Sequence, residues 1–462
     1  MQFKKIEIEE WRQFKNIDID FHPRMTIITG ANGAGKTTIL QILSQHYGWH
    51  TNLLATPKIL PGTGTTKYLT GFYKPFSQTV QEHQIVNSFF EPFNEMFNNN
   101  QFNNQLNNQL NNQLNNQFNN QVNIPLASQL NNIGRITYGN NFNSDIAIPS
   151  ESGIQYAIQI NNQQAVIGVH ITSHRPLQTY QQIGYIPTHA ISAEQAYFNY
   201  YQEIIQKYNG NFSQFSPTYR MKEAIISMAT FGPGNSIVQG NDEIARLFLE
   251  FKQVLSSILP PSIGFRDINI RIPDVVLITD TGEFVIDAAS GGLMSLIDLS
   301  WQIFLFSQHK TDFVVTIDEP ENHLHPSMQR SILRRLSHAF PNAQFIVVTH
   351  SPFIVSSVKD SNVYVLKYTE NRSIESSEFI GGQVTSLKLD LDGKAATANE
   401  ILRDVLGVPV TLPEWAENEL EVITNEFTGK PITAENLNAM RSALANAGLS
   451  EYFPDALKKI AG

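Results

Sequence analysis

The chain has 462 residues, enough for two or three domains, and 41% of them are hydrophobic, which supports a well-buried core. It carries a net charge of −10 and no cysteine. These counts exclude disulfides and cysteine-based zinc sites, and they disfavour a basic nucleic-acid coat protein. No apolar run approaches the roughly 18 residues of a membrane helix, and the N-terminus lacks the apolar segment of a signal peptide. We therefore expect a cytoplasmic protein with no membrane partner.

The first 30 residues predict a β-hairpin followed by a buried strand. Residues 3–21 alternate between polar and apolar side chains in two runs, and residues 25–29 form a mostly apolar run. Trp11 and Phe14 lie near the predicted turn. Two roles remain open for them: one of them stacks on an adenine, or they close the edge of a sheet.

A glycine-rich loop follows the buried strand. Residues 30–37, Gly-Ala-Asn-Gly-Ala-Gly-Lys-Thr, match G-x-x-x-x-G-K-T in full and precede an amphipathic helical run. Such a loop points backbone N–H groups at phosphate oxygens, and the helix N-terminus favours the same anion. We expect Lys36 to reach the β- and γ-phosphates and Thr37 to place its hydroxyl on Mg²⁺. The predicted nucleotide-binding residues here are Gly30, Asn32, Gly33, Gly35, Lys36, Thr37 and Thr38.

The sequence changes character between residues 98 and 132. A four-residue unit, Asn-Asn-Gln followed by an apolar residue, repeats five times from Asn103 to Val122, and no charged residue occurs between Glu95 and Arg135. A period of four keeps the apolar positions on one face of a strand but not of a helix. We expect a flexible or strand-like insertion with a tendency to aggregate. A repeat this regular is also typical of slippage in the coding DNA, without an essential function.

The segment from residue 133 to 289 mixes predicted strands and helices. Strands are expected at 134–138, 144–149, 154–160 and 165–171, the last two joined by a hairpin turn at Asn161–Gln164. Helices are expected around Glu194–Tyr208, Tyr219–Thr230 and Asn241–Leu259, and strands again at 265–272, 275–279 and 283–289. None of the helical stretches sustains heptads, so a long coiled coil is not expected.

Two further strands end in polar residues that suit phosphate chemistry. Residues 313–317 predict a buried parallel strand that ends in Asp318 and Glu319, and ligands bind at the carboxyl ends of such strands. We expect Asp318 to hold Mg²⁺ through water and Glu319 to orient and deprotonate the attacking water. A second buried strand, 345–349, ends in His350. A neutral imidazole there is expected to hydrogen-bond the γ-phosphate or the attacking water.

These motifs, with Ser290-Gly291-Gly292 at the start of a long helix, occur in the order found in ABC-type ATPases, which the chain resembles. In that family the Ser-Gly-Gly signature contacts the γ-phosphate of ATP bound to the opposite subunit. The signature departs from the usual form, with Ala289 before it and Leu293 where glutamine is common. The stretch IDEPENHLHP resembles more specifically the AAA-annotated ATPases grouped with OLD proteins, RecF and SMC-like repair ATPases.

The resemblance covers roughly residues 1–370 without the insertion. It implies an α/β fold: an ABC-ATPase head with a mixed sheet around the phosphate loop, an antiparallel β subdomain and a helical subdomain, plus a small C-terminal helical region. It also implies that residues 321–326 form the D-loop at a dimer interface, with His325 where transporter ATPases carry aspartate. The equivalent of the Q-loop is expected in residues 172–176, where Arg175 is equally suited to a salt bridge at the edge of the core.

The expected domains are 1–97, the N-terminal lobe with the phosphate loop; 98–132, the insertion; 133–370, the rest of the ATPase; and 371–462, a mostly helical region. From Leu391 onward the chain has 11 acidic and 6 basic residues, a charge of −5. Two interpretations remain open: the tail faces a protein partner rather than DNA, or it is a solvated cap on the core. Apolar residues at helical spacing mark the same segment: Ile401, Leu402, Val405 and Leu406.

Three related classes of ATPase carry features that the sequence does not predict here, and we therefore expect a function outside these classes. A transporter usually has the full signature, an SMC protein has a long coiled coil, and an OLD nuclease has a C-terminal Toprim domain. The chain instead resembles the ATPase subunits of two-gene anti-phage systems such as PARIS, Septu and the retron-associated ATPases. This resemblance implies binding of ATP and Mg²⁺, ATP hydrolysis and a head-to-tail dimer or larger assembly. It further implies a separate Toprim or HNH nuclease as effector, with DNA or a phage protein as the trigger.

The alternative is a stand-alone DNA-repair ATPase of RecF type. A catalytically inactive nucleotide-binding scaffold is a third class. It is disfavoured because Lys36, Asp318 and Glu319 are all present.

Overall fold

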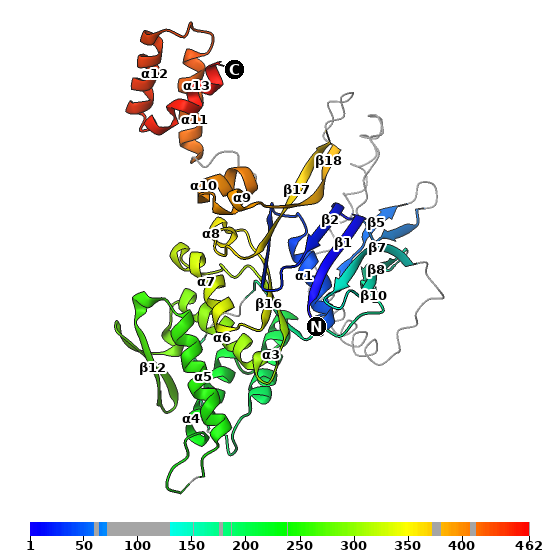
Figure 1. Cartoon of the computed structure of the whole chain (residues 1–462), viewed down its shortest axis with the longest axis vertical. Coiled ribbons are helices and arrows are strands. Elements are labelled where there is room, and N and C mark those ends of the chain that lie inside the picture. The colour runs from blue at the N-terminus through cyan, green and yellow to red at the C-terminus, as the bar shows by residue number, and fades with distance from the viewer. Residues whose placement is uncertain are drawn as a thin grey trace, which may run out of the picture.

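The computed structural model describes residues 1–59, 64–71, 130–150, 152–174, 179–185, 187–237, 239–371, 380–406 and 413–461. A mixed sheet of 11 strands runs through the middle of the molecule, with helices packed against it and a separate helical unit at the C-terminus (Figure 1). In spatial order its strands are β10 (Gln159–Asn161), β8 (Asn143–Pro149), β7 (Leu130–Tyr138), β1 (Phe3–Trp11), β2 (Phe14–Asp20), β18 (Ile380–Lys388), β17 (Asn362–Asn371), β3 (Met25–Gly30), β16 (Ala343–Val348), β15 (Phe313–Asp318) and β11 (Gly168–Ile171). The expected α/β fold with a mixed sheet is thereby confirmed.

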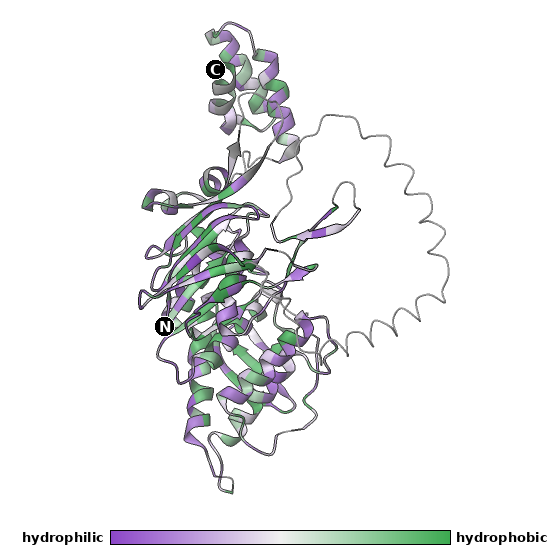
Figure 2. Cartoon of the chain, turned by 90° about the vertical axis from the view of Figure 1, so that its right-hand side faces the viewer, coloured by the Kyte–Doolittle hydropathy of each residue, from purple (hydrophilic) through white to green (hydrophobic). Residues whose placement is uncertain are grey.

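One end of the sheet consists of five parallel strands, β17, β3, β16, β15 and β11, with β11 at the edge. Every residue of β3, β15 and β16 is buried, which explains why these strands are almost continuously apolar. Successive side chains point to opposite faces, so Ile27 and Ile28 of β3 belong to two different core clusters. Figure 2 shows the apolar residues concentrated in this sheet and in the helices that pack on it.

The other end of the sheet is antiparallel and contains β2, β1, β7, β8 and β10. The predicted hairpin is present as β1 and β2, and β1 also pairs with β7, which pairs with β8. Trp11 and Phe14 are 2% and 0% exposed, and the Trp11 Nε1–H donates to Thr70 O at 3.2 Å. Their burial supports the role of closing the sheet and contradicts adenine stacking. Two small ribbons lie outside the main sheet: β4 (Leu53–Leu54) with β9 (Gln155–Tyr156), and β5 (Thr56–Ile59) with β6 (Thr66–Leu69).

Helices pack on the parallel strands and on one another. They are α1 (Lys36–Ser44), α3 (Ala193–Tyr208), α4 (Pro217–Phe231), α5 (Asp242–Ile258), α6 (Gly291–Ser307), α7 (Pro326–Ala339) and α8 (Pro352–Val355). The predicted strands before α6 form a small separate sheet, β12 (Phe265–Arg271), β13 (Asp274–Thr279) and β14 (Gly282–Val285). α6 is buried along most of its length, as its apolar sequence requires. None of the helices among the described residues is both long enough and apolar enough to cross a membrane.

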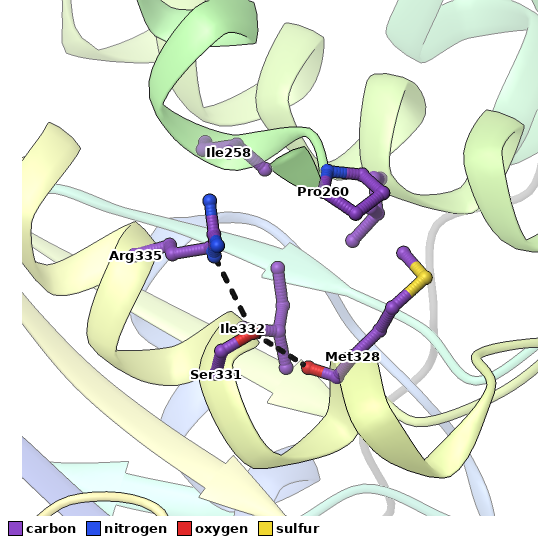
Figure 3. Close-up of a pocket in the computed structure, with 7 residues that line it drawn as sticks. Ile258, Pro260, Met328, Ser331, Ile332 and Arg335 are labelled. Carbon is purple, nitrogen blue, oxygen red and sulfur yellow. Dashed lines mark hydrogen bonds between the residues drawn. The ribbon is translucent and has the colours of Figure 1, made fainter. Parts of the chain in front are cut away.

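Arg335 joins the end of α5 to α7. Its Nη1 donates to Ser257 O at 3.0 Å and to Leu259 O at 3.2 Å, so it satisfies carbonyls that the α5 C-terminus leaves free. A cavity of about 10 Å³ lies beside this contact, and Figure 3 shows Arg335, Ser331, Met328 and Pro260 around it. This volume suits a single water molecule, so the cavity is a packing gap rather than a ligand site.

The C-terminal residues divide between the ATPase core and a separate unit. The main sheet continues past residue 370, because β18 pairs with β17 and β2. After α9 (Leu391–Ala395) and α10 (Ala398–Glu400), Ile401 and Val405 are buried in the main core. α11 (Glu414–Phe427), α12 (Ala434–Asn446) and α13 (Phe453–Ala461) then form a small core of their own. The helical region expected from residue 371 therefore begins later, and Ile401 and Val405 are not available to a partner.

Two other expectations differ from the structure or lie beyond it. Strands β10 and β11 flank the predicted turn at Asn161–Gln164 but do not pair: β10 pairs with β8 and β11 with β15. The predicted hairpin is therefore wrong. Most of the predicted insertion, residues 98–129, lies outside the described residues, and its last three residues belong to β7.

Candidate active site

The site lies where neighbouring parallel strands end. Strand pairing sets Asp318 of β15 opposite Val348 of β16, and Val348 opposite Ile28 of β3. The glycine-rich loop follows β3, Glu319 follows β15, and His350 follows β16. Because these strands run parallel, the three segments meet at one edge of the sheet, where ligands bind in open α/β folds.

The glycine-rich loop has the backbone that an anion cradle needs. Gly33 and Gly35 have φ angles of 76° and 90°, in the left-handed region that favours glycine. A Cβ at Gly35 would lie 2.4 Å from the ring of Phe14, so only glycine fits there. Ala31 and Asn32 are exposed at the tip of the loop, and Gly35 is the N-cap of α1. The N-terminus of α1 therefore faces the space where a phosphate would be held.

Lys36 lies folded back over this loop. Its Nζ donates to Gly30 O at 3.0 Å and to Ala31 O at 2.8 Å. Burial lowers the pKa of Lys36 to about 8, although the carboxylates of Asp318, Glu319 and Glu321 act in the opposite direction. The ammonium is therefore still mostly charged at neutral pH, and it is held at the loop that would bind phosphate.

Thr37 and Asp318 form the pair that the sequence predicts for Mg²⁺. The Thr37 hydroxyl donates to Asp318 Oδ2 at 3.0 Å. Asp318 Oδ1 is buried and has no hydrogen-bond partner among the described residues. Burial raises the pKa of Asp318 to about 6, opposed by the Thr37 hydrogen bond. A hard cation beside these oxygens would relieve both the unpaired atom and the cost of burying the charge, so the residues fit Mg²⁺.

Glu319 is turned out of the strand toward the cavity. Its φ is 50°, an uncommon value for a residue with a side chain, and its N–H donates to Val348 O at 2.9 Å. Asn322 Nδ2 donates to Glu319 Oε2 at 3.0 Å and to Ser173 O at 3.2 Å. His350 Nε2 lies 3.8 Å from Glu319 Oε1. Glu319 is thus held between Asn322 and His350, the geometry expected for a base that orients a water molecule.

Glu321 connects the segment after β15 with the segment after β16. Its Oε1 accepts hydrogen bonds from Thr349 Oγ1 at 2.7 Å, His350 N at 2.8 Å and Ser351 N at 3.1 Å. Burial raises the pKa of Glu321 and lowers the pKa of His350. The lowered pKa of His350 favours the neutral imidazole that the sequence analysis expected.

The predicted signature begins α6 and contacts the predicted D-loop of its own chain. Ser290 is the N-cap, and its side chain accepts a hydrogen bond from Leu293 N at 3.4 Å. A Cβ at Gly292 would lie 2.6 Å from His323 O, so this close approach requires glycine. Ser295 Oγ also donates to Asn322 O at 3.2 Å. The signature therefore packs directly against the segment that holds Glu319.

A cavity of about 220 Å³ opens beside the carboxylates of Asp318 and Glu319. It is bounded by residues at the ends of α1, α3, β11 and β15, which are Thr37, Gln41, Trp49, His170, Thr172, Ser173, His174, Tyr208, Asp318 and Glu319. The predicted Q-loop segment thus lies at the site through Thr172, Ser173 and His174. Arg175 lies outside the described residues.

The structure also places residues at the site that the sequence analysis did not select. Gln41 lies one turn after Thr37 on α1, so its position on the same face was readable from helical spacing. Asn322 and Glu321 belong to the predicted D-loop, but no sequence pattern indicates that they hold Glu319 and His350. Trp49 and His170 line the cavity because the fold brings distant segments together, and no sequence pattern marks them for this position.

Two family profiles match the chain. One, described as "AAA domain", matches residues 5–52, which contain the glycine-rich loop. The other, described as "AAA domain, putative AbiEii toxin, Type IV TA system", matches residues 263–356, which contain the signature, Asp318, Glu319 and His350. Both halves of the candidate site thus lie in segments that match profiles of AAA-type domains.

Curated relatives agree with these matches. The chain is 29% identical over 150 residues to "Retron Ec83 probable ATPase" of Escherichia coli, covering 30% of this chain and 27% of that protein. It is 27% identical over 214 residues to "Septu protein PtuA" of Bacillus thuringiensis, covering 44% of this chain and 51% of that protein. The chain therefore spans about half or less of the length of these relatives. The expected relation to retron and Septu ATPases is confirmed.

A solved structure, "SMC head domain from Thermotoga maritima", aligns with 84% of this chain and 100% of its own, with a TM-score of 0.39 and 12% identity.

Proposed function

We propose that this chain, a relative of retron and Septu ATPases, binds Mg²⁺-ATP and hydrolyses it as the regulatory subunit of an anti-phage defence complex. The observation that carries the proposal is the meeting of Lys36, the Thr37–Asp318 pair, Glu319 and His350 at one edge of the sheet. A phosphate cradle, an oxygen pair for a metal and a base beside an open cavity are the parts that γ-phosphate hydrolysis requires.

The residues have separable roles in this proposal. The loop N–H groups and Lys36 hold the phosphates, while Thr37 and Asp318 hold Mg²⁺. The metal, when bound, neutralises charge on the β- and γ-phosphates. Glu319, held by Asn322, orients the attacking water and accepts its proton. His350 contacts the γ-phosphate or that water, and its position depends on Glu321.

The signature acts on a second copy of the chain in this proposal. It contacts the γ-phosphate there through Ser290, Gly291 and Gly292, which makes the active unit a head-to-tail dimer or a larger assembly.

The test of catalysis is phosphate release by the purified chain and by two variants. Glu319→Gln should lower kcat by about 100-fold or more, because general-base catalysis typically contributes that much. It should still bind ATP and should accumulate an ATP-bound dimer. Lys36→Ala should lose ATP binding and is the control for nucleotide-dependent signals. Unchanged turnover in Glu319→Gln would remove Glu319 from the role of base.

The regulatory role is tested with the neighbouring gene. We expect that gene to encode a nuclease of Toprim or HNH type that co-purifies with this chain and that is inhibited or released according to the bound nucleotide. Nuclease activity that ignores ATP and the Glu319→Gln substitution would contradict this role. If no neighbouring nuclease exists and double-stranded DNA stimulates phosphate release, the chain acts as a stand-alone repair ATPase instead.

A further inference from the structure

Lys222 is a fully buried lysine that the proposed chemistry does not use. It lies on α4 with 0% exposure. Its Nζ is 2.8 Å from Asp287 Oδ2 and 3.7 Å from Asp274 Oδ1, and it donates to Gln181 O at 2.7 Å. The Asp287 side chain is only 5% exposed. Because a buried charge is costly without partners, these contacts hold Lys222 in one position.

The partners of Lys222 lead to the site from two directions. Asp287 lies in a short 3₁₀ turn, Ile286–Ala288, directly before Ser290. Asp274 begins β13 in the small sheet that leads to this turn. Gln181 comes a few residues after Thr172 and Ser173 in the chain, and these two residues line the cavity beside Glu319. Lys222 thus connects the signature with the segment that continues from the predicted Q-loop.

We propose that Lys222 and Asp287 are a positioning pair that fixes the Ser290–Gly292 signature for contact with ATP bound to a second copy of the chain. This inference rests on the proposed function, because the signature acts across a dimer only if the chain is such an ATPase. The pair does not touch nucleotide. It acts through the turn at Ile286–Ala288, which sets where the N-terminus of α6 begins.

The chemistry of the pair supports positioning rather than stability. An ion pair in the interior gains little over apolar residues of the same volume, because removing both charges from water is expensive. Its directed contacts, however, allow one geometry where apolar packing allows several. Two carboxylates and one backbone carbonyl from separate segments surround one Nζ: Gln181 O accepts its hydrogen bond, and Asp287 and Asp274 face it as ionic partners. A lysine at this point therefore fixes the segments relative to one another.

The same helix offers a matched control. Arg220 lies two residues before Lys222 and pairs with Glu203 and Glu223, each at 3.0 Å. The two glutamate side chains are 9% and 6% exposed. The glutamates of this second cluster are about as buried as Asp287, although Arg220 itself is 21% exposed, and they lie on α3 and α4 and not next to the signature.

The experiment compares two double variants in the Glu319→Gln background. Lys222→Met with Asp287→Asn removes the proposed pair, and Arg220→Met with Glu203→Gln removes the control pair. ATP affinity is measured by calorimetry, Tm by thermal unfolding, and ATP-dependent dimer formation by light scattering. We expect the first variant to bind ATP like its parent but to dimerise about tenfold more weakly or worse. In the chain with Glu319 intact, its kcat should fall while KM stays unchanged. The control should dimerise and turn over normally even if its Tm is lower.

The single variant Asp287→Asn guards against misfolding of the double variant. It keeps the side-chain volume and leaves Lys222 with Asp274 and Gln181, so it should fold and show a smaller loss of dimerisation. Dimerisation and kcat equal to those of the control in both Asp287 variants would overturn the positioning role. A Glu319→Gln parent that does not dimerise with ATP would overturn the proposed head-to-tail dimer itself, and with it this inference. The two failures are distinguishable because the second appears before any Lys222 variant is made.

Discussion

At the scale of single residues, three carboxylates within four positions have three different environments. Asp318 is buried beside the Thr37 hydroxyl, Glu319 is partly exposed toward the cavity, and Glu321 accepts backbone hydrogen bonds from the segment after β16. The left-handed φ of Glu319 separates the first two, because it turns the chain sharply at the end of β15. In the proposed function, one short segment therefore supplies the metal ligand and the base, and it also supports His350.

The support role of Glu321 gives a prediction. Glu321→Ala leaves the N–H group of His350 without its acceptor, which costs roughly 1–3 kcal/mol, whereas Ser351 N keeps its hydrogen bond to Thr349 Oγ1. We expect a lower Tm and a kcat reduced by about tenfold or more, measured by thermal unfolding and phosphate release. Glu321→Gln retains an acceptor oxygen and is the matched control with a smaller effect. Equal kcat values for the two variants would show that the hydrogen bonds to Oε1 do not position His350.

The pKa values of Asp318 and Lys36 predict the pH dependence of kcat/KM. Protonation of Asp318, whose pKa is raised to about 6, should weaken metal binding, so kcat/KM should fall as the pH drops through about 6. Deprotonation of Lys36, whose pKa is lowered to about 8, should weaken phosphate binding, so kcat/KM should fall as the pH rises through about 8.

Magnesium concentration separates Asp318 from other acids. The metal competes with the proton for the Asp318 carboxylate, so raising Mg²⁺ should move the acidic limb to lower pH and leave the alkaline limb in place. The measurement is a pH series of kcat/KM at low and high Mg²⁺. An acidic limb that does not respond to Mg²⁺ would assign it to a group that does not hold the metal.

At the scale of elements, local sequence patterns predicted the strands and helices themselves better than they predicted which strands pair. The hairpin β1–β2, the buried strands β3, β15 and β16 and the helices α3–α5 all follow from periodicity, because burial acts on each segment separately. The pairing of β10 with β8 and β11 with β15 does not, because it depends on long-range contacts. The same limit applies to the site: the motifs identified Lys36, Asp318 and Glu319, whereas the Glu321 hydrogen bonds and the Lys222 contacts exist only in the fold.

The junction of α5 and α7 gives a prediction at this scale. Arg335→Ala removes the donor to two carbonyls at the end of α5, and hydrogen bonds from a charged group contribute about 1.5–3 kcal/mol. We expect the free energy of unfolding in urea to fall by about that amount. ATP affinity should not change, because the contact lies away from the glycine-rich loop.

Arg334 provides the control for Arg335. It is the preceding residue on α7, carries the same charge and is exposed. Arg334→Ala should change the free energy of unfolding by about 0.5 kcal/mol or less, as is usual for surface substitutions. If both variants lose the same stability, the effect comes from helix charge rather than from the α5 carbonyls.

At the scale of the whole molecule, the C-terminal helices form a unit with its own core. Its buried residues come from α11, α12, α13 and Leu449, which lies between the last two helices. α11 carries five glutamates and no lysine or arginine, and it exposes Trp415 and Val422 at 65% and 57%. An exposed tryptophan on a helix of one charge suits docking to a basic protein surface. We therefore propose that the effector docks on α11 rather than at Ile401 and Val405, which are buried in the main core.

Two truncations test this division. A chain that ends at Leu406 keeps Ile401 and Val405 in the main core, so we expect unchanged ATP affinity, kcat and Tm of the ATPase part, together with loss of co-purification of the neighbour-encoded protein. A chain that ends at Ala396 also removes Ile401 and Val405, and it should lose several kcal/mol of stability, because each buried aliphatic side chain contributes about 1.5–3 kcal/mol. Thermal unfolding and co-purification are measured for both. If the chain ending at Leu406 still binds the neighbour-encoded protein, the docking surface lies on the ATPase part. If it unfolds like the shorter chain, the C-terminal helices are part of one cooperative core.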